Sequence, residues 1–177
     1  MSLPTARARI MDLLDGAAYC LLNEKALPAT CLCMVAVDTM ASLSRPTNTD
    51  RVTRQHFVAF IEKYVLPQRH LPCTALEIYA LRCGLLHAQS PRSELGEAGK
   101  VRDIWFGYGS TDLDQLQAAA DRSHRSGSVV VVSLTDLLQA ITDGTASFGA
   151  HLERDAALRS LVEQRSDRLY ATMETGP

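Results

Sequence analysis

The stretch Ile78-Tyr-Ala-Leu-Arg-Cys-Gly-Leu-Leu-His87 places an arginine inside a helix that is apolar on nearly every side. On a helical wheel, one apolar face holds Leu76, Tyr79, Ala80, Cys83 and Leu86. The opposite apolar face holds Ile78, Leu81 and Leu85. Such a helix is predicted to be sandwiched between neighbours, within one subunit or across a dimer. Arg82 lies between these faces, and arginine is rarely buried unless it is paired or functional. We therefore expect this helix to be central to both fold and function.

Helical periodicity continues on the amino-terminal side of this stretch. Apolar spacing, with prolines and capping residues at the boundaries, predicts four helices. They lie at about 5–25, at 29–42, between the Thr47-Asn-Thr capping cluster and Pro67, and at 73–89. Pro72 introduces the last of these helices and Pro91 closes it. The first half of the chain is therefore predicted to be helical, with short loops.

The second half begins with a different pattern. A polar loop is predicted at 90–100, and Val101–Tyr108 and Val129–Val132 are predicted to be paired strands, with a weak helical pattern between them at 111–124. Ser133-x-x-Asp136 resembles a capping box that starts a helix, which Gly144 and Gly149 are expected to interrupt or fray. A final helix is expected at 155–173. The predicted fold is one mainly α domain over 1–177, an antiparallel helical bundle with a two-stranded β-hairpin insertion at about 91–133.

Composition sets broad limits on function. The 177 residues are 46% hydrophobic with a net charge of −2, which is typical of a globular protein with no global attraction to nucleic acid or anionic membranes. No apolar run approaches the ~20 residues of a membrane span, and the amino terminus lacks a secretory signal pattern.

Cys31 and Cys33 would splay their thiols on a helix, which disfavours a zinc site. Free thiols in a reducing cytoplasm are the favoured interpretation of the five cysteines.

The string Leu81-Arg-Cys-Gly-Leu-Leu-His-Ala88, an arginine followed after four residues by a histidine in a central helix, resembles the HEPN superfamily. Many members of that superfamily are helical-bundle, metal-independent endoribonucleases of toxin–antitoxin, antiphage and RNA-processing systems. The resemblance implies a homodimer with Arg82 and His87 as catalytic residues, RNA as the substrate, an antitoxin as a partner, and no cofactor or metal. The chain departs from the family pattern at Cys83, where a polar residue is common, and at Gln89, where some relatives carry a modifiable tyrosine. The insertion has no motif assignable to the family.

A second match to the same spacing shows that context matters more than spacing. Arg51-Val-Thr-Arg-Gln-His56 lies at a helix start among polar residues, where a solvated face is the natural interpretation. Only the Arg82 copy lies in an apolar helix near a proline stop.

The chemistry of RNA cleavage suits the two residues. Attack by the 2′-hydroxyl needs a proton acceptor, a proton donor and a cation near the phosphorus; histidine fits both proton roles, and arginine supplies a permanent charge and a fork of donors. On a regular α-helix, residues five apart are separated by about 7.5 Å along the axis and about 140° around it. We therefore expect Arg82 and His87 to cooperate across a two-fold dimer.

Several alternatives remain open at this level. Glu77, or a carboxylate on a neighbouring helix, would pair with Arg82 in a purely structural role, and His87 would cap the last helical carbonyls. Arg122, His124 and Arg125 form a small basic loop that would contact phosphates, although a solvated turn is favoured. The alternative function is a non-catalytic helical dimer that acts as an interaction or regulatory module.

Overall fold

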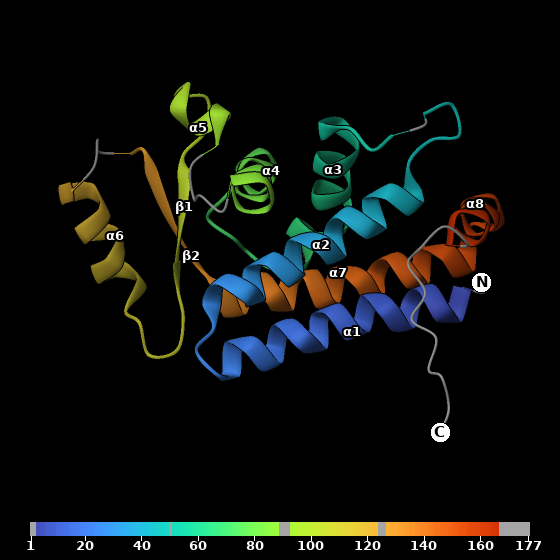
Figure 1. Cartoon of the computed structure of the whole chain (residues 1–177), viewed down its shortest axis with the longest axis horizontal. Helices are drawn as coiled ribbons and strands as arrows, with labels where there is room; N and C mark the ends of the chain where they lie inside the picture. Colours follow the sequence, from blue (N-terminus) through green and yellow to red (C-terminus); the bar gives the residue numbers. More distant parts are fainter. Residues whose placement is uncertain (1–2, 50, 89–92, 124–126, 167–177) are drawn as a thin grey trace.

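Helices dominate the computed structural model, which describes residues 3–49, 51–88, 93–123 and 127–166 (Figure 1). The α-helices are α1 (Leu3–Leu22), α2 (Ala26–Ser44), α3 (Arg54–Phe60), α4 (Ala75–Cys83), α5 (Glu94–Glu97), α6 (Leu113–Ser123), α7 (Leu134–Arg154) and α8 (Ala156–Ser166). Two π-helical segments, η1 (Ile61–Val65) and η3 (Gly84–Ala88), extend α3 and α4, and a 3-10 turn, η2 (Leu66–Gln68), follows η1. The strands are β1 (Asp103–Gly107) and β2 (Val129–Ser133). The predicted mainly helical class is confirmed.

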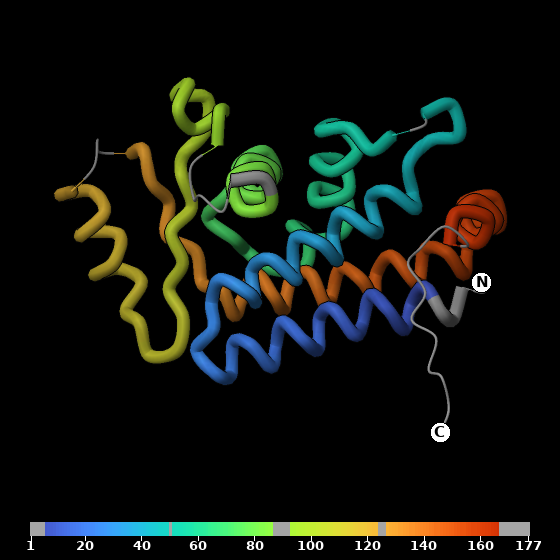
Figure 2. Tube along the Cα trace, in the orientation of Figure 1, coloured from blue at the N-terminus to red at the C-terminus, as the bar shows by residue number. Residues whose placement is uncertain are grey.

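The three long helices form one layer. In the trace of Figure 2, α1 runs opposite to α2 and α7, while α2 and α7 run in the same direction. Helix α4 crosses this layer, and α8 crosses its far end (Figure 1). The predicted antiparallel order therefore applies to α1 against its neighbours and not to the helices as a whole.

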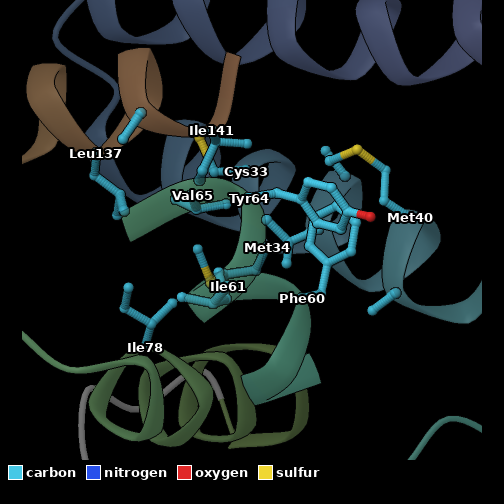
Figure 3. Close-up of a cluster of buried hydrophobic side chains, with 14 of the residues drawn as sticks. Cys33, Met34, Met40, Phe60, Ile61, Tyr64, Val65, Ile78, Leu137 and Ile141 are labelled. Carbon is cyan, nitrogen blue, oxygen red and sulfur yellow. The ribbon is translucent and has the colours of Figure 1, made fainter. Parts of the chain in front are cut away.

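The core lies where this layer meets α3, η1 and α4. Figure 3 shows side chains from α2, η1, α4 and α7 converging there, among them Met34, Ile61, Ile78 and Ile141, which are completely buried. Helix α2 contributes most, because its apolar residues surround the helix axis and nine of its nineteen residues are buried. Among the described helices, α2 alone is long and apolar enough to cross a membrane by those two criteria, and half of that stretch is buried inside the structure. A core helix passes the same test.

The two strands are parallel, so the predicted hairpin is wrong. Asp103 pairs with Val129 and Gly107 with Ser133, in one continuous parallel register. Parallel strands need a crossover connection, usually a helix, and the weakly periodic stretch after β1 supplies it as α6. Gln117 of α6 seals the outer edge of β2, because its side-chain amide donates to the Val129 carbonyl and accepts from the Val131 N–H.

Helix α7 runs without interruption through both of its glycines, contrary to the sequence prediction. Gly144 is a point of close approach, since a Cβ there would lie 2.7 Å from the backbone carbonyl oxygen of Tyr64. Its lack of a side chain therefore lets α7 pack directly against η1. The start of the helix agrees with the sequence: the Ser133 hydroxyl accepts from the Asp136 N–H at 3.1 Å. The expected loop at 90–100 contains the short helix α5, and the expected helix beyond Ser166 lies outside the described residues.

Candidate functional site

Helix α4 is fixed at its amino end by a reciprocal capping box. The Thr74 hydroxyl accepts from the Glu77 N–H at 3.2 Å, and the Glu77 carboxylate accepts from the Thr74 N–H at 2.7 Å. Behind this cap, Ile78, Leu81 and Leu85 are buried in the core, as their spacing predicts. The opposite face, with Leu76, Tyr79, Cys83 and Leu86, is only partly covered.

Glu77 pairs with Arg102, just before β1, and not with Arg82. Arg102 donates through Nε to Oε1 at 2.6 Å and through Nη2 to Oε2 at 3.1 Å, while the Glu77 side chain is 5% exposed. Burial alone would raise the pKa of Glu77, but the hydrogen bonds from Arg102 and Thr74 outweigh it and hold that pKa below its ordinary value. Glu77 therefore anchors α4 to the strands and does not form the pair with Arg82 considered from sequence.

Arg82 pairs inside the subunit with Asp38 of α2. Its Nε donates to Asp38 Oδ2 at 2.9 Å, and Nη2 donates to the same oxygen. The two side chains are 18% and 21% exposed, so the pair lies at the edge of the core. Partial burial works to lower the pKa of Arg82, but the hydrogen bond and charge of Asp38 outweigh it and raise that pKa. Arg82 is thus a permanent cation held in a defined orientation.

The helix changes its winding between Arg82 and His87. From Gly84 to Ala88 the backbone is π-helical and not α-helical. A π turn bonds residues i and i+5, so each turn holds more residues. Residues five apart are consequently separated by a smaller angle around the helix axis than the 140° expected for a regular α-helix. The backbone of His87 belongs to this turn, whereas its side chain lies outside what the structure describes.

A cavity of about 800 Å³ opens beside the partly covered face of α4. Its lining comes from three places, the start of α3, the end of α4 and the α5 region, and consists of Thr53, Arg54, Gln55, Tyr79, Cys83, Gly84, Ser93, Glu94, Leu95 and Glu97. The lining carries both signs of charge. The Cys83 thiol, at its wall, interacts electrostatically with both Tyr79 and Arg82. The cavity therefore adjoins Arg82 through the next residue in the chain.

The basic loop considered from sequence is remote from this site. Arg122 is an exposed residue of α6, which packs on β2, and Figure 1 places α6 and α4 on opposite sides of the two strands. His124 and Arg125 lie outside the described residues. The structure thus does not bring Arg122 together with Arg82.

No metal-binding cluster is present in the described part of the chain, where no group of three or more histidine, cysteine or acidic residues is arranged to hold an ion. All five cysteines are free thiols. Burial raises the pKa of Cys33 and of Cys73 to about 12, which makes both unreactive packing residues.

Two contacts are not identified residue by residue from the sequence, although a carboxylate on a neighbouring helix is among the alternatives considered there for Arg82, and Asp38 of α2 is such a carboxylate. Asp38 is the only charged residue of α2, and a lone carboxylate in an apolar helix is a detectable signal for a partner to the lone arginine of α4. The second contact joins Tyr64 Oη and His151 Nδ1 at 2.5 Å across 87 residues, with His151 Nε2 lying 3.7 Å from Asp155 Oδ2. Only the spacing of His151 and Asp155 is visible locally, and nothing in the sequence links them to Tyr64.

No family model, curated protein or solved structure matches this chain.

Proposed function

We propose that this chain is a HEPN-like, homodimeric, metal-independent endoribonuclease, with Arg82 and His87 as its catalytic residues. Support comes chiefly from η3, the π-helical turn that includes His87 and begins two residues after Arg82. Such turns are rare within helices and occur frequently at functional sites. This one shortens the angular gap between the two residues and lies beside the cavity of about 800 Å³.

The two residues have complementary roles in the proposed reaction. The RNA 2′-hydroxyl attacks the adjacent phosphorus, the bond to the 5′-oxygen breaks, and the products are a 2′,3′-cyclic phosphate and a 5′-hydroxyl. In the dimer, His87 of one subunit accepts the 2′-hydroxyl proton. His87 of the other subunit donates a proton to the leaving 5′-oxygen. Arg82 stabilises the extra negative charge on the phosphorane oxygens.

Asp38 acts in this scheme as a positioning residue. Because Oδ2 accepts from both Nε and Nη2, the plane of the Arg82 guanidinium is fixed relative to α2 and α4. A fixed donor fork needs no reorganisation when charge develops on the substrate. The raised pKa of Arg82 keeps the charge in place at any working pH.

A cleavage assay in EDTA tests this function. Purified protein is expected to cleave a generic single-stranded RNA to products ending in cyclic phosphate, and Arg82→Ala and His87→Ala are each expected to abolish cleavage. The matched control is Arg159→Ala, which removes another ion-paired arginine, 54% exposed on α8. Circular dichroism verifies that each variant is folded. Cleavage that survives both site substitutions would remove the assignment.

The double substitution Arg82→Asp with Asp38→Arg separates position from stability. It restores an ion pair between α2 and α4 but moves the guanidinium to α2. Recovery of stability without recovery of cleavage is expected if the location of Arg82 matters for catalysis.

The second candidate is a non-catalytic helical dimer that acts as an interaction or regulatory module. The Arg82–Asp38 pair favours it, because an arginine paired inside one subunit is also a plain structural tie between helices. This candidate predicts no cleavage of any RNA and a loss of stability in Arg82→Ala. Cleavage abolished by His87→Ala in a folded protein would contradict it.

A further inference from the structure

A second cavity, of about 230 Å³, lies away from α4, where the end of α2, the α3–η1 segment and α8 meet. Its polar lining includes Arg45, His56, Lys63 and Tyr64, while Phe60 and Leu158 supply apolar wall. No acidic residue is among its described lining residues. The cavity is smaller than the roughly 300–1,000 Å³ of drug-sized pockets, which suits a small anionic group.

His56 lines this cavity, and its ring is held by a contact at Nδ1. Its Nδ1 accepts the Thr53 backbone N–H at 3.1 Å as part of the α3 capping box. A ring nitrogen that accepts a hydrogen bond carries no proton, so in the neutral imidazole the proton lies on Nε2. Nε2 has no partner among the described residues. His56 therefore offers an N–H donor without needing to be charged.

Lys63 supplies the charge. It follows His56 by seven residues and shares its helical face through Ala59 and Phe60, all four of which line the cavity. Its ammonium lies 5.1 Å from the centroid of the Tyr64 ring and forms no ion pair with any described carboxylate. An ammonium and an imidazole N–H facing one small cavity are a pair of donors suited to an oxyanion.

The remaining wall is preorganised. Arg45 is tied to its own loop, with Nε donating to the Thr49 carbonyl at 3.0 Å and Nη1 donating to Ser42. It therefore contributes a fixed positive charge and not a mobile donor. Tyr64 is held by its hydroxyl contact to His151 and by ring contacts to Phe60 and Phe148, at centroid distances of 4.8 and 5.2 Å; Figure 3 shows the Phe60 and Tyr64 rings side by side.

We propose that this cavity binds a phosphate group, as free phosphate or as a phosphomonoester, with the Lys63 ammonium and the His56 Nε2–H as its donors. The site is independent of the proposed nuclease function, because it shares no residue with α4. Three features favour a ligand that accepts hydrogen bonds and carries negative charge: the absence of acidic residues from the described lining, the assigned tautomer of His56, and an ammonium that forms no ion pair with a described carboxylate.

Titration of the full chain with inorganic phosphate, at constant ionic strength set with chloride, tests the site. The ring signals of His56 in NMR spectra are expected to shift saturably, and calorimetry gives the affinity. Lys63→Gln is expected to weaken binding by about tenfold or more, the loss typical of one charge-assisted hydrogen bond. Lys25→Gln, which removes an exposed lysine between α1 and α2, is expected to leave the affinity unchanged.

A second variant keeps the local fold while reversing the chemistry. His56→Glu converts the start of α3 into a Thr-x-x-Glu capping box, which preserves the helix, but places a carboxylate where the donor was; phosphate binding is expected to be lost with the circular dichroism unchanged. Phenyl phosphate distinguishes the two sources, since tighter binding than inorganic phosphate indicates a phosphomonoester and weaker binding indicates the free ion. Absence of saturable binding to the folded wild type, or equal affinities of Lys63→Gln and Lys25→Gln, would overturn the proposal.

Discussion

The two ends of α4 carry ion pairs of different kinds. At the amino end, both oxygens of the Glu77 carboxylate are bonded, and the side chain is 5% exposed. At the carboxyl end, Nε and Nη2 of Arg82 both donate to Oδ2 of Asp38, and the two side chains are 18% and 21% exposed. The amino end also holds the strands, through Arg102, whereas the carboxyl end adjoins a cavity and a π turn.

This difference separates an anchoring end of the helix from the end at which the proposed function lies. A carboxylate that is buried and bonded on both oxygens has no freedom to serve a ligand, so Glu77 is suited to holding the fold together. An arginine that keeps its charge and is partly exposed is suited to a charged substrate. Predictions that compare the two ends test this division.

The largest effect is expected from Glu77→Ala. It removes half of the capping box and leaves Arg102 without its partner, and we expect a loss of about 3 kcal/mol in the free energy of unfolding, at the lower end of the range for broken buried pairs. The lower end applies because Arg102 is 39% exposed and can be hydrated once released. Urea unfolding followed by circular dichroism measures the loss.

The control for this effect is Glu77→Gln. Glutamine at this position still accepts the Thr74 N–H but carries no charge, so its cost should be clearly smaller than that of alanine. Equal losses in the two variants would mean that the charge pair with Arg102 alone stabilises this end.

A smaller effect is expected at the other end of α4. Arg82→Ala and Asp38→Ala should each cost about 1–2 kcal/mol, between the values for exposed and buried pairs. In a double-mutant cycle the coupling between them should be about 1 kcal/mol. A coupling near zero would make the contact incidental, and single losses larger than that of Glu77→Ala would reverse the proposed ranking of the two ends.

The sequence predicts the helices well because periodicity and caps are local. The helices at α1, α2, α4 and α7 lie close to their expected positions, and Ser133 caps α7 as expected. The apolar faces of α4 point to its central place in the fold. Each of these features depends on residues within a few positions of one another, where physical preferences can be deduced from composition and spacing.

What the sequence fails to predict depends on distant parts of the chain. Strand direction is invisible in the residues of the strands themselves, although the helix predicted between them at 111–124 is the kind of crossover that parallel strands need. The Arg82–Asp38 contact spans 44 residues. The π turns at η1 and η3 have no sequence signature, so the 140° separation assumed for Arg82 and His87 could not be corrected in advance.

The smallest effect is the acid dependence of the amino end of α4. The pKa of Glu77 in the folded chain lies below its unfolded value of about 4.3, so folding favours the ionised carboxylate. The resulting stabilisation is complete above that unfolded value and is lost as the pH falls through the folded pKa. The stability difference between wild type and Glu77→Gln should therefore be constant near neutrality and narrow below about pH 4.

Urea unfolding of both proteins at pH 7, 5 and 3.5 measures the difference, which should be smaller than the cost of Glu77→Ala because a protonated carboxyl group still fills the site and bonds Thr74. A difference that stays constant down to the lowest pH would show that the charge of Glu77 contributes nothing to anchoring, and the contrast between the two ends of α4 would then rest on hydrogen bonding alone.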